Sequence, residues 1–218
     1  MTSIAEASVK CAVCRRTSVQ EILLSSIAIG SPDLDFRPPV LERDTLELWL
    51  QQCPHCGYCA PDLKEKTQER AIVKSRAYQS MLNESPFPPI ARKFLARAML
   101  VDAADPAAAA DSLLNAAWAC DDRLSQDLAT ECRRMMISTL ARARPFADSN
   151  LDCLWGSIAV DALRRSGDFA QAKAESNELL SRDGVPPAVR RVLEFQLQLI
   201  ASQDLNAHTM DECEAPAS

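Results

Sequence analysis

The sequence predicts a mainly α-helical protein in which a small, β-containing, zinc-ribbon-like head precedes antiparallel helical hairpins. Two Cys-x-x-Cys pairs within residues 1–60 predict the head. After about residue 60, strong helix formers dominate and β-branched residues are sparse, which favours helices. Only 5 glycines occur in 218 residues, so few positions demand unusual backbone angles. We expect a metal-binding head over 1–60, a helical domain over 61–205 and a disordered tail over 206–218.

Short β segments and one ordered loop are expected in the head. Val19–Leu24 is one candidate strand. Thr45–Gln52 is the better candidate, because leucines alternate there with polar or aromatic residues, as in a strand with one buried face. Between them, Ser31–Pro39 is expected to be an ordered loop, because its repeated prolines forbid a central strand and most of a helix.

About seven helices are expected after Pro61, separated by Pro, Gly, Asp and Ser residues. In the third helix, Asp105 is expected to be the N-cap, with Pro106 at the first helical position. The expected helices cover about Asp62–Asn83, Pro89–Asp102, a stretch from Asp105 onward, Asp122–Arg144, Ser149–Arg165, Asp168–Arg182 and a stretch starting near Pro186.

Helices with such short connections are expected to pack as antiparallel hairpins. Around Gly167, the sequence is similar to the turn of a tetratricopeptide repeat, in which a glycine at the turn is followed five positions later by a small residue, here Ala172. One copy of this pattern is recognisable, so we expect repeat-like hairpins rather than a regular solenoid.

Two short turns carry the chemistry that the sequence indicates most clearly. A two-residue spacer lets one tight turn aim two thiolates at a single ion, and two such turns supply the tetrahedron that zinc prefers. Gly57 follows the second pair, where the backbone must bend sharply around the metal. Iron can use the same four ligands but would require a redox role with no visible partner site, so zinc is the expected metal. The predicted ligands are Cys11, Cys14, Cys53 and Cys56.

The remaining cysteines have less specific interpretations. The total of 9 is odd, which argues against a full set of disulfides. Cys59 forms a third, overlapping pair with Cys56; we expect a packed or free thiol, with a metal or redox role left open. The second pair also has the spacing of thioredoxin-class thiol oxidases, but their strand–helix setting is absent. Packing residues within helices are expected to be Cys120, Cys132 and Cys153, whereas Cys213 lies in the acidic tail.

No catalytic constellation is visible in the sequence. Both of its 2 histidines, His55 and His208, lie in unpromising places for general acid–base chemistry, and His55 is expected to be exposed. No Gly-rich phosphate loop occurs. Near the Pro-rich loop, Asp33 and Asp35 are expected to cap turns and to pair with Arg37. These observations favour a protein that is not an enzyme.

Charge and hydropathy exclude further classes of protein. The net charge is -6 and the pI about 5.0, which does not indicate a generally basic nucleic-acid-binding surface. No apolar run approaches the roughly 20 residues needed to span a bilayer, and Met1–Lys10 lacks the apolar core of a secretory signal. We expect a cytoplasmic protein without a membrane partner. A solvated helix face is expected for Arg133, Arg134, Arg142 and Arg144.

Several segments resemble the bacterial proteins grouped as domain of unknown function 2225. They are Cys11–Cys14, Trp49–Tyr58, Leu114–Trp118 and Gly167–Phe169. The resemblance implies a bacterial, cytoplasmic protein with a zinc-ribbon-like head and a repeat-like helical body, and it implies no activity. This chain has Arg15 where a glycine is common, so the first turn is expected to have a different geometry. It also has Cys59 in place of a small apolar residue.

The leading hypothesis is a non-catalytic zinc-binding protein that acts as a protein-interaction or scaffold module, because helical hairpins form concave surfaces for partners. The first alternative is a nucleic-acid-binding zinc ribbon that uses Lys10, Arg15, Arg16 and Trp49. The second alternative is a thiol-redox or metal-sensing accessory protein that uses Cys56 and Cys59.

Overall fold

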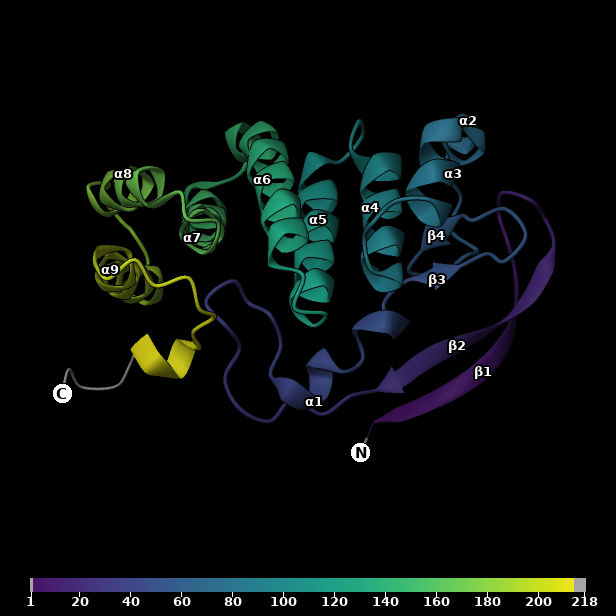
Figure 1. The fold of residues 1–218 in the computed structure, drawn as a ribbon, viewed down its shortest axis with the longest axis horizontal. Coiled ribbons are helices and arrows are strands. Elements are labelled where there is room, and N and C mark those ends of the chain that lie inside the picture. The colour runs from purple at the N-terminus through teal and green to yellow at the C-terminus, as the bar shows by residue number, and fades with distance from the viewer. Residues whose placement is uncertain (1, 214–218) are drawn as a thin grey trace.

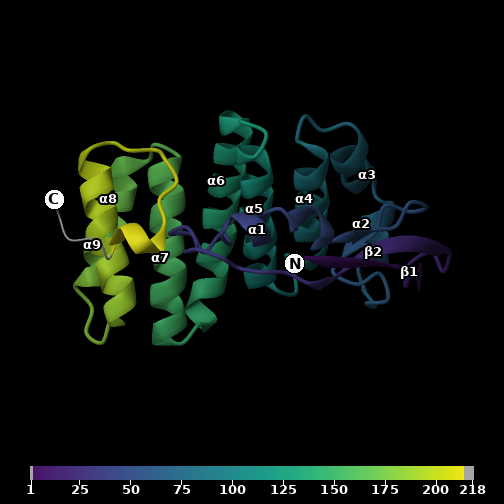
Figure 2. The same cartoon turned by 90° about the horizontal axis from the view of Figure 1, so that it is seen from below.

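The computed structural model describes residues 2–213. It is mainly α-helical, with small antiparallel β segments on the amino-terminal side, as the sequence predicts. The helices stand side by side in a row that leads away from the strands (Figure 1), and the same row is seen from below in Figure 2. Within residues 2–213, no helix is long and apolar enough to cross a membrane.

The amino-terminal hairpin consists of β1 (Ser3–Lys10) and β2 (Thr17–Ser25), which pair antiparallel. The predicted strand Val19–Leu24 lies within β2 and is confirmed. No strand is predicted over β1, whose small and polar residues give a weak pattern. Lys10 pairs with Thr17, so the first Cys-x-x-Cys turn lies between the two strands. A second pair of short strands, β3 (Gln51–Gln52) and β4 (Cys59–Ala60), flanks the second turn.

The prediction of a strand over Thr45–Gln52 is wrong for most of its length. After α1 (Val40–Arg43), this stretch forms the 3-10 helix η1 (Leu46–Leu48), and only Gln51–Gln52 is a strand. Leu46 and Leu50 are both buried in the helical core. A spacing of four also places two residues on one face of a strand, so the alternating pattern does not distinguish the two conformations and the packing of these leucines decides.

The predicted helix Asp62–Asn83 is shorter than expected and is interrupted. Residues 61–69 form a loop, followed by α2 (Arg70–Lys74) and α3 (Arg76–Asn83). Ser75 separates the two helices because its backbone is extended, and its hydroxyl accepts a hydrogen bond from the Tyr78 N–H at 3.2 Å. A serine N-cap therefore begins a new helix inside the predicted one.

The later helices lie close to their predicted positions. The cap at Asp105 is confirmed, since its carboxylate accepts a hydrogen bond from the Ala108 N–H at 3.0 Å. Gly167 has a φ of 79° in the turn between two helices, where glycine is favoured. These helices are α4 (Pro89–Val101), α5 (Pro106–Asp121), α6 (Gln126–Ala143), α7 (Ser149–Arg165), α8 (Phe169–Leu180) and α9 (Pro187–Ala201), with short 3-10 helices η2 (Arg144–Phe146) and η3 (Met210–Cys213).

Apolar side chains join the head to the helices. One cluster contains residues of the two cysteine turns together with Val73, Tyr78 and Leu82 from α2 and α3, and Ala96 and Leu100 from α4. Further clusters fill the space among α4–α6 and among α7–α9. The head therefore shares a core with the first helices.

The segment between β2 and α1 crosses the helical row (Figure 2). We call residues 31–39 the strap. Leu34 of the strap is fully buried against Val192 and Leu199 of α9, and Asp35 is hydrogen-bonded to Trp118 of α5. The strap thus connects helices that are distant in the sequence.

The expectation of a disordered tail from residue 206 does not hold over 206–213. The His208 carbonyl accepts a hydrogen bond from the Leu34 N–H, and the Met210 N–H donates to the Pro32 carbonyl, both at 2.9 Å. Thr209 forms a β-bridge with Asp33. Backbone pairing with the strap therefore orders this segment, whereas residues 214–218 lie outside the described part of the chain.

Candidate metal centre

The two cysteine turns have the same backbone geometry. In the first, the Cys11 N–H donates to the Arg16 carbonyl at 2.9 Å and the Arg15 N–H donates to the Cys11 carbonyl at 3.0 Å. In the second, the Cys53 N–H donates to the Tyr58 carbonyl and the Gly57 N–H donates to the Cys53 carbonyl, both at 2.9 Å. Each turn therefore holds its two cysteines on one side of a closed backbone loop.

A left-handed residue closes each turn. Arg15 has a φ of 66° and Gly57 a φ of 78°. The expectation that Arg15 would change the geometry is therefore wrong, although an L-residue with a side chain adopts this conformation at a cost of about 1–2 kcal/mol. Glycine is needed more strictly at residue 57, where an added Cβ would lie 2.8 Å from Leu82 Cδ1.

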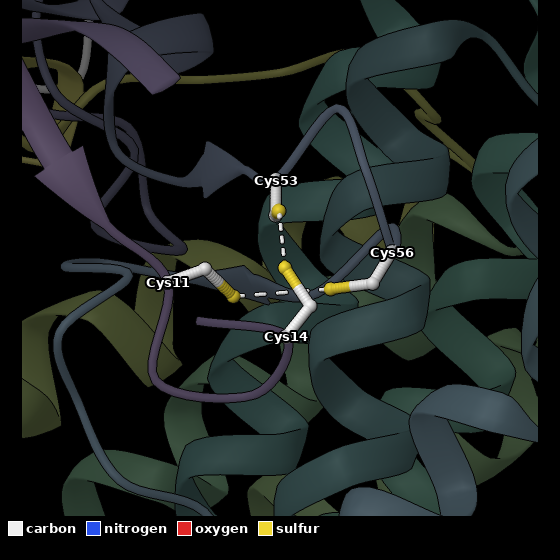
Figure 3. Close-up of side chains that lie close together, drawn as sticks. All are labelled: Cys11, Cys14, Cys53 and Cys56. Atoms are coloured by element: carbon white, nitrogen blue, oxygen red, sulfur yellow. Dashed lines mark hydrogen bonds between the residues drawn. The ribbon is translucent and has the colours of Figure 1, made fainter. Parts of the chain in front are cut away.

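The four predicted ligand sulfurs converge between these turns (Figure 3). They all lie within 4.8 Å of one another. Cys11 Sγ lies 3.8 Å from Cys56 Sγ, and Cys14 Sγ lies 3.6 Å from Cys53 Sγ. Four sulfurs around a tetrahedral ion with bonds of about 2.3 Å lie about 3.8 Å apart, whereas a disulfide requires about 2.0 Å. The arrangement therefore fits a metal ion and not a pair of disulfides.

The protonation of the four thiols depends on burial and on local hydrogen bonds. Burial raises the pKa of Cys53 and Cys56 above the usual thiol value. At Cys14, burial acts in the same direction, but hydrogen bonds from the Arg16 backbone and the neighbouring thiols outweigh it and lower the pKa. A cation bound among the sulfurs would favour the thiolate form of all four, so metal binding would release protons.

Helix α3 supports the second turn through three side chains that belong to no recognisable sequence motif. The Tyr78 hydroxyl donates to the Gly57 carbonyl at 3.0 Å and accepts from the Cys59 N–H at 3.2 Å. Gln79 Nε2 donates to the Cys56 carbonyl at 3.0 Å. Leu82 fills the space that the absent side chain of Gly57 leaves. No motif marks these residues, because they meet the turn only through tertiary packing.

The first turn is held by the loop after β4. The Ala12 N–H donates to the Leu63 carbonyl at 2.8 Å. Arg70 Nη2 donates to the Ala12 carbonyl at 3.4 Å. Residues 61–70 therefore hold the first turn, and α3 holds the second.

Cys59 lies outside the four-sulfur cluster. Its side chain is fully buried, its Sγ donates to the Gly57 carbonyl at 3.3 Å, and burial raises its pKa to about 12. His55 is exposed, as expected, with Nε2 3.4 Å from the Thr17 carbonyl oxygen. Three cysteines that were expected to pack within helices are buried, which confirms the prediction; they are Cys120, Cys132 and Cys153.

The acidic residues of the strap form a second polar cluster, away from the metal centre. Asp35 accepts hydrogen bonds from Trp118 Nε1 at 2.7 Å and from Arg165 Nη1 at 3.4 Å. Asp33 accepts from Arg43 Nη2 at 2.8 Å. The Arg37 backbone N–H donates to Asp35 Oδ1 at 3.2 Å, so Asp35 caps this turn as expected, whereas the Arg37 guanidinium forms its ion pair with Asp122 at 2.5 Å. The cluster attaches the strap to the helices.

Two other expectations about charged and aromatic residues are corrected. Arg133 is not on a solvated face, because it is buried and paired with Asp121. Arg144 is also mostly buried, between Asp152 and Glu175. Trp49 packs edge-on against Trp118 with ring centroids 6.4 Å apart, so it belongs to the helical core.

Comparison with protein-family models, curated proteins and solved structures finds no match for this chain. The resemblance to domain of unknown function 2225 therefore stays a prediction. The metal centre is supported by its own geometry.

Proposed function

We propose that this chain is a non-catalytic zinc-binding protein that acts as a protein-interaction or scaffold module. The observation that carries the proposal is the closed set of four mutually close cysteine sulfurs. Structural zinc sites use four protein ligands, whereas catalytic sites keep a position open for water or substrate. A site of this kind stabilises a shape and leaves no position for chemistry at the metal.

Zinc is favoured over iron on chemical grounds. The four thiolates would suit either ion. Iron would imply electron transfer, a role for which no partner site is visible among the described residues. We therefore assign the site a structural role, in which zinc is the usual ion.

The interaction role is supported by exposed apolar side chains on the hairpin and the segment that follows it. Their relative exposures range from 37% to 65%. Neighbouring exposed apolar residues in a soluble protein commonly mark a contact surface. We place the partner surface on this hairpin and the segment after it. The exposed apolar residues there are Ile4, Val19, Leu24, Ile27 and Ile29.

Elemental analysis and a binding assay test the two halves of this proposal. Purified protein is expected to contain one zinc ion per chain, lost when all four cysteines are replaced by serine. The zinc-loaded protein is expected to retain a protein partner that a Val19→Ser, Leu24→Ser variant retains weakly. Recovery of no partner by the unmodified, zinc-loaded protein would count against the interaction role. A metal content near zero would count against the zinc role.

A further inference from the structure

Basic residues gather around the metal centre although the chain as a whole is acidic. Residues 10–16 and 61–76 contain eight basic and three acidic residues, a surplus of five positive charges, whereas the chain carries a net charge of -6. All eight basic side chains are exposed. We call them the basic end, and they are Lys10, Arg15, Arg16, Lys64, Lys66, Arg70, Lys74 and Arg76.

The fold brings these two stretches together in space. The Ala12–Leu63 backbone hydrogen bond and the Arg70–Ala12 contact attach the loop after β4 directly to the first cysteine turn. The hairpin tip, this loop and α2 lie at the same end of the molecule (Figure 1). The first cysteine turn carries Arg15, and the second is hydrogen-bonded to α3. A metal ion that joins the two turns would therefore hold the hairpin tip against the helices.

The positive charge of the basic end is little compensated by other residues. Within residues 2–213, none of its eight side chains forms an ion pair. Of the acidic residues nearby, Glu65 pairs with Arg97 at 3.3 Å, and Asp62 accepts from the Lys64 N–H at 2.8 Å. In the helical domain, by contrast, arginines such as Arg144 and Arg165 are each paired with two carboxylates.

The residue types at the basic end favour a nucleic acid over a protein as the partner. Centres of protein interfaces are enriched in aromatic residues and depleted in lysine. Here half of the eight basic residues are lysines, and the two local tyrosines, Tyr58 and Tyr78, are fully buried. Exposed, flexible cations without aromatic anchors are suited to phosphate contacts, which carry affinity without sequence preference.

We propose that the basic end binds the phosphate backbone of a nucleic acid, without sequence preference, and that the metal centre holds the required cations on one surface. This binding would be additional to the protein contact proposed above, because it uses a different set of residues. The corrected position of Trp49 removes the aromatic residue that could have stacked on a base. Affinity would therefore depend mainly on charge.

Anisotropy titrations of zinc-loaded protein with labelled mixed-sequence RNA and DNA oligonucleotides test the proposal. The test variant is Arg16→Gln, Lys64→Gln, Lys66→Gln, and the matched control is Arg123→Gln, Lys173→Gln, Arg190→Gln in the helical domain. If the three test residues contact phosphates of a single strand, the slope of log K against log salt is expected to become shallower by about 2. The control is expected to keep the slope of the unmodified protein.

Several outcomes would overturn the proposal, and zinc content is measured for each variant so that loss of the metal site is recognised separately. The first is the absence of binding by unmodified, zinc-loaded protein at low salt. The second is an equal loss of affinity in the test and control variants. The third is equally tight binding of anionic lipid vesicles or of polyglutamate, which would show attraction to any anion.

Discussion

The metal centre and the strap both attach distant segments of the chain, but they do so by different chemistry. At the metal centre, residues separated by 39 positions in the sequence, such as Cys14 and Cys53, place their thiols 3.6 Å apart. At the strap, residues separated by 130 positions, Asp35 and Arg165, meet as a buried ion pair. The first junction is built for an ion from solution, whereas the second is completed by charges of the chain.

This difference predicts that the two junctions respond differently to the removal of metal. Four thiolates gathered at one point repel one another unless a cation lies among them, so this junction is expected to depend on metal. The strap carries its own counter-charges and hydrogen bonds, so it should persist when metal is removed. Selective disruption of each junction therefore tests whether the head and the α5–α9 region are stabilised independently.

Metal removal is expected to have the largest effect. A structural zinc ion contributes on the order of 10 kcal/mol to the folding of small metal modules. Exhaustive chelation is therefore expected to abolish amide protection in β1–β4 and α3, while α7–α9 stay protected in hydrogen exchange. Addition of zinc should restore the head. If the head stayed fully protected after the metal had been shown to be absent, the claim that metal stabilises the head would be contradicted.

Replacement of Asp35 by alanine is expected to have the next largest effect. It leaves Trp118 Nε1 without its acceptor and removes one of the two carboxylates paired with Arg165. Each buried group left short of a partner costs about 1–3 kcal/mol, so the unpaired Trp118 donor and the weakened contacts of Arg165 together are expected to cost about 3 kcal/mol. Chemical denaturation measures it, with the exposed Glu131→Ala as the control. Zinc content should stay unchanged, and a loss of zinc would show that the junctions are coupled.

Substitution of the left-handed residues gives a matched comparison within the metal centre. Gly57→Ala combines a positive φ with a Cβ 2.8 Å from Leu82, so it is expected to destabilise the protein by about 2 kcal/mol and to weaken metal binding. Arg15→Gly relieves the same backbone strain and is expected to leave stability within about 1 kcal/mol of the original. Thermal unfolding of the zinc-loaded variants would reveal the asymmetry. Equal effects would show that α3 does not restrict the second turn.

The smallest expected effect is the pH dependence of two aspartates with opposite pKa shifts. Burial raises the pKa of Asp35, so its contribution to stability is fully present below the usual value of about 3.9 and is lost as the pH rises through the raised pKa. The Arg144 hydrogen bond lowers the pKa of Asp152, so its contribution is present above about 3.9 and is lost as the pH falls through the lowered pKa.

Denaturation of Asp35→Asn and Asp152→Asn across acidic pH measures both trends. Each variant is compared with the unmodified protein at the same pH, so that loss of metal in acid cancels. The stability advantage of the unmodified protein should decrease with rising pH for Asp35→Asn and increase with rising pH for Asp152→Asn. Trends of the same sign would contradict the assigned environments.

The parts of the structure predictable from the sequence are those determined by local signals. The spacing of the cysteines predicts the cluster, and caps such as Asp105 predict the helix starts, because each depends on a few neighbouring residues. Ser75 is also a local signal, but the long amphipathic pattern around it conceals the break between α2 and α3.

The remaining features depend on contacts between distant segments. Tyr78 and Gln79 support the second turn from 21 and 23 residues away, and no spacing rule identifies them. The burial of Asp35 by α5 and α7 likewise follows from the path of the strap across the helices. Leu46 and Leu50 satisfy both a strand and a helical pattern, and only the packing around them decides between the two.

X-ray absorption spectroscopy of the purified, metal-loaded protein tests the central claim most directly. Four sulfur neighbours at about 2.3 Å around one zinc ion are predicted, and the number of sulfur neighbours should fall in a Cys14→Ser variant. A first coordination shell made mainly of oxygen or nitrogen, or a spectrum that the Cys14→Ser substitution leaves unchanged, would contradict the assignment of these four cysteines as the metal ligands.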